Sequence, residues 1–314
     1  MSWRAASLLL LASLMSSIAS AQNGGAPLDT VWLDQAWDFD RPADSEARFR
    51  AKLESLPNGG AARLELETQI ARALGLQRRF DAAHAALNDV EKTLSGQPPR
   101  VTVRYLLERG RVFNSSGEPE RAVPLFREAF DKANAAREEF LAIDAAHMLG
   151  IAAAPEERLA WNLEAVAMTE RSEDARSKRW LASLYNNIGW TYHDRGDYAA
   201  ALAYFQKALP AWQARGPAAN VRIARWAIAR AYRSLGRFDE ALAIQNELAR
   251  ECVSAGAPDG YVYEELGELL LAMGDATAAR PNFARAYQLL SEDKGLQAAA
   301  PERLARLKRM GGIE

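Results

Sequence analysis

The sequence YNNIGWTYHDRGDYAAALAYFQKA, residues 185–208, decides the fold of this chain. Gly189 and Ala201 are small residues on either side of Gly196, which tolerates the left-handed backbone that ends a helix. Small side chains at the first two positions let two helices approach closely, because helix spacing depends on the residues at the contact. The stretch predicts a helical hairpin, with Phe205 on the buried stripe of its second helix.

The same pattern recurs along most of the chain. The copies start near residues 64, 103, 143, 182, 222 and 260, at intervals of 38 to 40 residues. The position of Gly189 is taken by Ala71, Gly110, Gly150, Ala229 and Gly267 in the other copies, and that of Ala201 by Ala83, Ala122, Ala241 and Ala279. The third copy has a shorter turn with Pro155, and we expect Ala160 to take the Ala201 role there. Six copies in near-constant phase predict one repeat region over residues 62–292.

The pattern resembles the tetratricopeptide repeat, whose consensus reads W-x2-L-G-x2-Y and then A-x3-F. The matching residues here are Tyr185, Ile188, Gly189, Tyr192, Ala201 and Phe205. Such repeats usually span ~34 residues, and the longer period is similar to that of kinesin light chains. The resemblance implies an all-α fold, namely a right-handed superhelical solenoid of helical hairpins.

Short helical caps are expected at both ends of the solenoid. Residues 22–61 contain an N-terminal segment and a capping helix, and residues 293–314 a C-terminal capping helix and tail. The N-terminal segment also carries Trp32 and Trp37, which either pack over the first repeat or bind a partner.

Residues 1–21 have the pattern of a secretory signal peptide, with Arg4, an apolar centre over residues 8–14 and the small residues Ala19-Ser20-Ala21. The alternative is a membrane anchor, but serines interrupt the run and it is shorter than the ~20 residues that a spanning helix needs. We therefore expect export, with cleavage after Ala21, and no stable membrane span afterwards. The Ala- and Arg-rich composition favours a bacterial periplasm.

The net charge and the cysteine content limit the partners and the thiol chemistry that we expect. The formal net charge of −2 over 314 residues argues against nucleic acid as a partner. Cys252 is the only cysteine, so an internal disulfide is excluded, and a buried inert thiol is expected there rather than a reactive one.

In tetratricopeptide repeats the first helix of each hairpin lines a concave groove, and the resemblance implies which residues face it. These are Arg104, Arg111, Asn114, His147, Asn186, Trp190, His193, Trp226, Arg230 and Arg233. Trp and Arg are the residue types that most often anchor interfaces, and Arg matches carboxylates. The cluster predicts binding of a protein or extended peptide with acidic groups. Taken singly, an Arg on a helix face is usually just solvated, and Trp190 could fill packing between neighbouring repeats.

Catalytic patterns are weak. The three histidines lack metal-ligand spacing, no phosphate-binding glycine loop occurs, and we expect no metal and no cofactor. Glu264 and Glu268 share one helix face and would bring two carboxylates together, as in an envelope enzyme that acts on glycan or peptide. A solvated charged face is the commoner meaning of that spacing. The sequence therefore predicts a binding scaffold and no catalytic residue.

Overall fold

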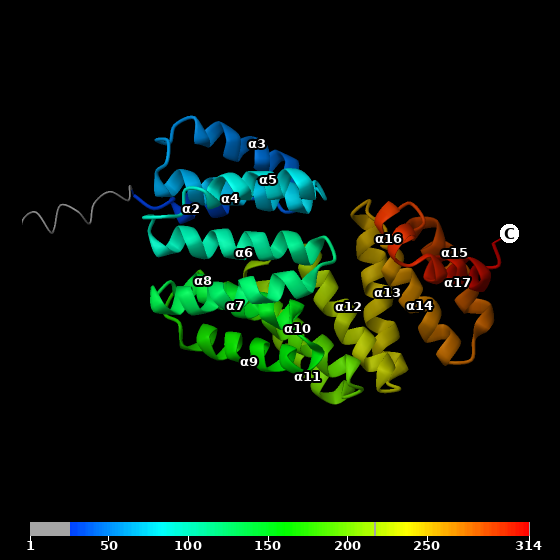
Figure 1. Ribbon diagram of the computed structural model, residues 1–314. Helices are drawn as coiled ribbons and strands as arrows, with labels where there is room; N and C mark the ends of the chain where they lie inside the picture. The colour runs from blue at the N-terminus through cyan, green and yellow to red at the C-terminus, as the bar shows by residue number, and fades with distance from the viewer. Residues whose placement is uncertain (1–25, 217, 314) are drawn as a thin grey trace, which may run out of the picture. The chain divides into compact units, whose positions relative to one another are not determined.

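The structure is a computed structural model, and it describes residues 26–216 and 218–313. Every regular element among these residues is helical, with sixteen α-helices, one short 3-10 helix and no strand (Figure 1). The expected all-α class is confirmed. The chain divides into two compact units, residues 1–168 and 169–314, which are described in turn.

Unit 1 contains two N-terminal helices and three hairpins. The first two are α2 (Thr30–Ala36) and α3 (Pro42–Leu53), and α3 packs against α4. The hairpins are α4/α5 (Ala61–Leu76 and Phe80–Glu91), α6/α7 (Pro99–Ser115 and Pro119–Ala135) and α8/α9 (Glu139–Ala152 and Pro155–Arg171, whose last turn belongs to unit 2). The first helices of the hairpins pack in sequence, α4 against α6 and α6 against α8.

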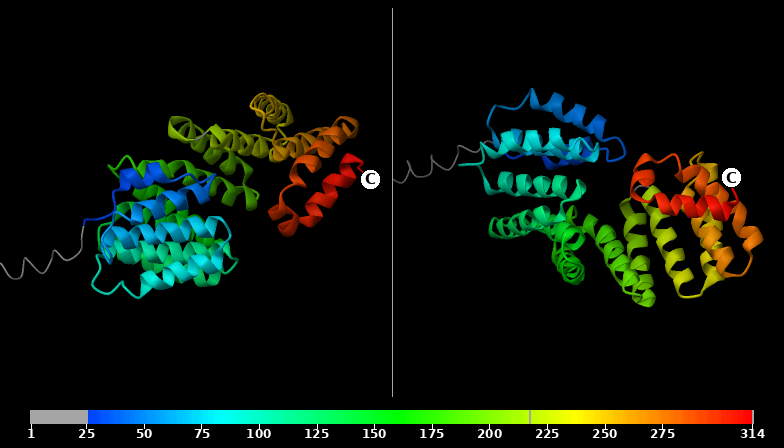
Figure 2. Two further views of the ribbon diagram at one scale, coloured as in Figure 1. Left: turned by 90° about the horizontal axis from the view of Figure 1, so that it is seen from above. Right: turned by 45° about the vertical axis from the view of Figure 1, so that its right-hand side comes forward.

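Unit 2 continues the hairpins and ends in a cap. After η1 (Ser177–Arg179) come α10/α11 (Trp180–Asp194 and Tyr198–Arg215), α12/α13 (Ala218–Ser234 and Phe238–Ser254) and α14/α15 (Gly260–Ala272 and Ala276–Leu290). The chain closes with α16 (Lys294–Ala299) and α17 (Pro301–Gly311). Helix α17 packs on α15, and Figure 2 shows the two lying side by side.

The two helices of a hairpin meet at a small residue of the first helix, which lies under a larger side chain of the second helix. Gly110 and Gly189 lie under Phe126 and Phe205, and a Cβ atom on either glycine would come within 2.5 Å of the ring. Gly267 lies under Phe283 in the same way, at 2.8 Å. All three phenylalanine side chains are fully buried. The same positions in the first and fifth copies hold Ala71 and Leu87, and Ala229 and Gln245, all of which are buried. Close helix contact therefore depends on these pairs.

The third copy differs from its expected alignment. Gly150 is covered by Asn162, whose Nδ2 donates hydrogen bonds to the carbonyl oxygens of Gly150 and Arg158, both at 3.0 Å. Ala160 is exposed, so the prediction that it takes the Ala201 role is wrong. The turn is two residues shorter than expected, because α9 begins directly at Pro155 and brings residue 158 to the Ala201 position.

The tryptophans of the N-terminal segment pack against α3. Trp37 and Trp32 lie edge-on to the buried Phe49, at ring distances of 4.9 and 6.2 Å. Trp37 Nε1 also donates to the side-chain oxygen of Gln69 in α4 at 3.2 Å. Of the two alternatives for these tryptophans, the structure shows packing.

Candidate functional site

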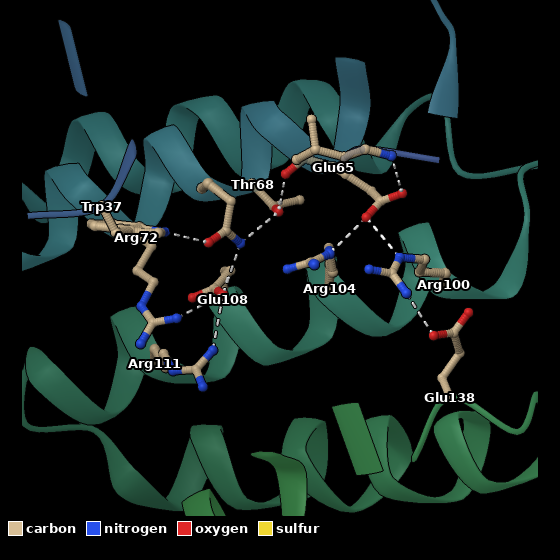
Figure 3. A network of polar contacts seen from close by, with 11 residues as sticks. Trp37, Glu65, Thr68, Arg72, Arg100, Arg104, Glu108, Arg111 and Glu138 are labelled. Atoms are coloured by element: carbon tan, nitrogen blue, oxygen red, sulfur yellow. Dashed lines mark hydrogen bonds and ion pairs between the residues drawn. The ribbon is translucent and has the colours of Figure 1, made fainter. Parts of the chain in front are cut away.

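Arg104, a predicted groove residue of unit 1, lies in a buried polar network between α4 and α6 (Figure 3). The carboxylate of Glu65 accepts hydrogen bonds from Arg104 Nε at 2.7 Å, Arg100 Nε at 2.9 Å and the backbone amide of Leu28 at 3.3 Å. Arg100 extends the network to Glu138 at 2.7 Å. Arg104 therefore joins two repeats and is only 4% exposed.

Arg111 lies in the same helix as Arg104, about two turns further along α6. Its guanidinium pairs with Glu108 in its own helix at 2.9 Å and with Asp144 in α8. Burial disfavours the charge of Arg111, but these two carboxylates outweigh burial and raise its pKa. Buried ion pairs of this kind fix how neighbouring helices sit, and they leave little of the guanidinium for a ligand.

The other two predicted residues of unit 1 are half-buried. Asn114 lies in the last turn of α6, and His147 lies in α8 near Asp144 and Arg111. Burial lowers the pKa of His147 to about 4, so this side chain is neutral near pH 7.

In unit 2, two adjoining cavities form one groove, which we call the α10–α14 groove. The first has a volume of about 410 Å³ and the second about 490 Å³, and both are bordered by Trp190, Trp226 and Arg303. The first is otherwise lined by Ala219, Arg222, Ile223, Asp259, Tyr261 and Val262, and the second by Arg230, Arg233, Glu264, Glu265 and Glu268. One end of the groove is thus apolar and the other charged.

The two indoles are held in place by neighbouring groups. Their ring centroids lie 6.1 Å apart, and Trp190 also packs edge-on to the buried Phe205 at 5.0 Å. Trp226 Nε1 donates to the carbonyl oxygen of Tyr261 at 3.1 Å. Beside them, the side chains of Ile223 and Tyr261 are 55% and 38% exposed. The apolar end therefore offers open hydrophobic surface next to rigid aromatic rings.

The charged end is organised around Glu265 of α14, which is 2% exposed. Its carboxylate accepts hydrogen bonds from Arg233 at 2.5 and 3.1 Å and from Arg230 at 3.2 Å. Burial raises the pKa of Glu265, and Arg233 opposes that effect. Two arginines of α12 therefore share one carboxylate.

Glu264 and Glu268, the carboxylates of the enzyme alternative, both line the charged cavity. Arg303 binds both oxygens of Glu264 at 2.5 to 3.1 Å, and Arg306 pairs with Glu268. Each carboxylate is held by its own arginine from α17, an arrangement that stabilises charge and leaves neither as a free acid–base group.

Four of the predicted residues, Trp190, Trp226, Arg230 and Arg233, line the α10–α14 groove, whereas Asn186 and His193 line neither cavity. His193 Nε2 lies 3.0 Å from Ser234 Oγ, and its ring is 5.2 Å from that of Trp190. Burial lowers the pKa of His193. His193 therefore contacts a groove residue, Trp190, without lining either cavity itself.

Sequence reasoning missed Arg222 and Arg303 of the groove. Arg303 belongs to the capping helix, which was expected only to cover the last repeat. The missed signal is spacing, because Arg303 and its partner Glu264 are 39 residues apart, one repeat period. The same separation joins Arg104 to Glu65. Helix α17 thus pairs with α14 in the way that the first helix of one hairpin, α6, pairs with the first helix of the preceding hairpin, α4.

Residues 26–216 and 218–313 lack two further features. No group of three His, Cys, Asp or Glu side chains within these ranges is arranged to hold a metal ion. None of the helices there has both the length and the apolar character to cross a bilayer. Cys252 is buried, and burial raises the pKa of its thiol, which fits the expected inert role.

Comparisons with known proteins agree with this architecture. Residues 180–250, from α10 into α13, match the model of the tetratricopeptide repeat family. Among curated proteins, none matches the chain in sequence.

Several solved structures have a similar fold. The chain is 12% identical to the apo form of RapI, with a TM-score of 0.64 over 90% of this chain and 78% of that one. It is 14% identical to a tetratricopeptide repeat protein from Parabacteroides merdae, with a TM-score of 0.53 over 89% and 97%. A putative kinesin light chain from Podosopora anserina with nearly identical TPR-like repeats is 17% identical, with a TM-score of 0.51 over 63% and 99%.

These similarities establish the fold, and the family match covers the repeats whose residues carry the consensus most completely. In α6/α7, α8/α9 and α14/α15, outside the matched residues, a glycine likewise lies under a larger side chain. Residues 180–250 therefore match the tetratricopeptide repeat family, and the chain has the helical-hairpin fold of tetratricopeptide repeat proteins.

Proposed function

We propose that this protein is an exported binding scaffold that holds an extended segment of a partner protein in the α10–α14 groove. The fold is one that typically serves protein–protein interaction. The observation that carries the proposal is the pair of adjoining cavities that share Trp190 and Trp226. Rigid indoles beside arginine side chains are the residue types that dominate binding energy at protein interfaces.

The shape of the groove suits a chain segment better than a compact ligand. It runs from the exposed apolar surface at Ile223 to the arginine pair at Glu265, and it is lined by three helices and by the cap α17. A ligand that contacts both ends has to be elongated and to carry both apolar and polar groups.

Export rests on the sequence of residues 1–21, which lie outside the described residues. We propose that they direct the chain across a membrane and are removed after Ala21, which would place the scaffold in a bacterial periplasm. Mass spectrometry of the mature protein from the cell envelope tests this, and a mature N-terminus at Met1 would contradict it.

Site-specific photo-crosslinking tests the groove. The side chains of Ile223 in the groove and Val253 on α13 are almost equally exposed, at 55% and 56%. Val253 lines neither cavity and therefore serves as the control position. With a photoreactive phenylalanine analogue at one position or the other in native cells, we expect one discrete crosslinked partner from position 223 alone. The same product in equal yield from both positions, or no product from 223, would contradict the proposal.

A further inference from the structure

The three glutamates of the α10–α14 groove are already paired with arginines. Glu264 is bound by Arg303, Glu268 by Arg306, and Glu265 by both Arg230 and Arg233. Asp259 caps α14 by accepting the amide of Tyr261 at 2.8 Å. The three glutamates are therefore neutralised by arginines, whereas Asp259 is held by a backbone amide alone.

Arg222 stands apart from these pairs. It lines the apolar cavity, and no ion pair or hydrogen bond joins its guanidinium to another of the described residues. By contrast, Arg225, one turn later on α12, is paired with Glu247 and Glu251 at 2.6 to 2.8 Å. Asp259 lines the same cavity, but its carboxylate already accepts the amide of Tyr261, whereas the guanidinium of Arg222 keeps its donors for an anion.

The apolar surface lies next to that charge. Arg222 and Trp226 are one helical turn apart on α12, so their side chains lie on the same face. Ile223 and Tyr261, both partly exposed, complete the cavity of about 410 Å³ together with Val262 and Trp190. A cavity of this size admits a bulky apolar or aromatic side chain, and burial there removes exposed apolar surface from water.

We infer that the groove selects a peptide segment in which a bulky apolar side chain is adjacent to a carboxylate. The apolar side chain lies between Ile223, Trp226 and Tyr261, and the carboxylate binds the guanidinium of Arg222. This specificity rests on the proposed function, since it assigns the ligand chemistry of the same groove.

Selection from a library of random displayed peptides tests the inference on the full chain. On the wild type, we expect enriched sequences to carry Phe, Trp, Leu or Ile next to Asp or Glu. Arg222→Gln should abolish the acidic preference and keep the apolar one, and Ile223→Ser should do the reverse. Removal of a charged hydrogen bond should weaken an individual selected peptide about tenfold. The matched controls Arg225→Gln and Val253→Ser should enrich the same sequences as the wild type.

The outcomes separate the two proposals. Enriched peptides that lack either feature, or identical preferences on Arg222→Gln and on the wild type, would overturn the ligand assignment and leave peptide binding in place. A wild-type chain that enriches no peptide would overturn the ligand assignment and the proposed function together.

Discussion

Gly110 lies so close to the ring of Phe126 that a Cβ atom on the glycine would come 2.5 Å from Cε1 of the phenylalanine. The contact joins α6 to α7, and the same relation holds between Gly189 and Phe205 in unit 2. In these hairpins the first helix therefore needs a glycine where the second helix inserts a phenylalanine.

Substitution of Gly110 tests this relation against a matched glycine. We expect Gly110→Ala to lower the free energy of unfolding by about 1–3 kcal/mol, because Phe126 is fully buried and cannot move aside. Gly75 is also inside a helix of unit 1, but a Cβ atom there would meet Val112 at an ordinary 3.5 Å. Gly75→Ala should stabilise by about 0.5–1 kcal/mol, as alanine usually does in a helix. Denaturant unfolding of both variants is the measurement, and equal destabilisation would refute the argument.

Gln245 occupies the phenylalanine position of the fifth repeat, and both of its side-chain polar atoms are buried without a hydrogen-bond partner. Gln245→Leu should raise the free energy of unfolding by about 1–3 kcal/mol, because it removes two unsatisfied groups. Leucine is the residue that accompanies an alanine in the first repeat, at Leu87. Gln245→Phe should gain less or destabilise, because Ala229 leaves no room for a ring. A thermal melt in which Gln245→Phe is more stable than Gln245→Leu would contradict the pairing of alanine with leucine at these two positions.

The polar network of unit 1 predicts a cost for loss of Glu65, which is 1% exposed and neutralises Arg104. Glu65→Gln should destabilise by about 3–5 kcal/mol, because it leaves a buried guanidinium without its counter-charge. Glu128, half-exposed and 3.5 Å from Lys132, is the control, and Glu128→Gln should change stability by less than about 1 kcal/mol. Chemical denaturation distinguishes the two, and a small effect at Glu65 would show that the network is dispensable.

His147 predicts a dependence of stability on pH. Burial lowers its pKa from 6.5 to about 4, so between these values the unfolded chain binds a proton that the folded chain does not. Stability from this group is therefore complete above pH 6.5 and is lost as the pH falls toward 4. From pH 7.5 to 5.0 the loss should be about 1–2 kcal/mol.

The variant His147→Gln isolates this contribution. Its loss of stability over the same pH interval should be smaller than that of the wild type, because the titrating group is gone while Asp144 and Arg111 remain. His84→Gln is the control, because it leaves His147 in place and should retain most of the dependence. Equal pH dependence in wild type and His147→Gln would contradict the assignment.

The hairpins were predictable from the sequence because their packing depends on residues that lie close together in the chain. Gly189, Ala201 and Phe205 recur in phase because close helix packing allows few alternatives at those positions. The third repeat was misaligned because Asn162 stands in place of the expected aromatic residue. Its side chain donates a hydrogen bond to the carbonyl oxygen of Gly150, and a pattern of hydrophobic residues does not reveal such a polar contact.

The groove was only partly predictable, for an electrostatic reason. Family positions place Arg104, Arg111, Arg230 and Arg233 on first helices, but they do not say which acidic residue on a neighbouring helix captures each one. Glu65 and Asp144 draw the first two into the interior of unit 1. Arg222 has no such partner among the described residues and stays available. That distinction depends on contacts between repeats, which lie about one period apart in the sequence.

Hydroxyl-radical footprinting of the chain with and without its crosslinked partner tests the central claim most directly. Binding in the α10–α14 groove predicts that oxidation of Ile223, Trp226 and Tyr261 falls when the partner is present, while that of Val253 and Met273, both exposed and outside the cavities, is unchanged. Unchanged oxidation of the three groove residues, with protection elsewhere on the chain, would contradict the account.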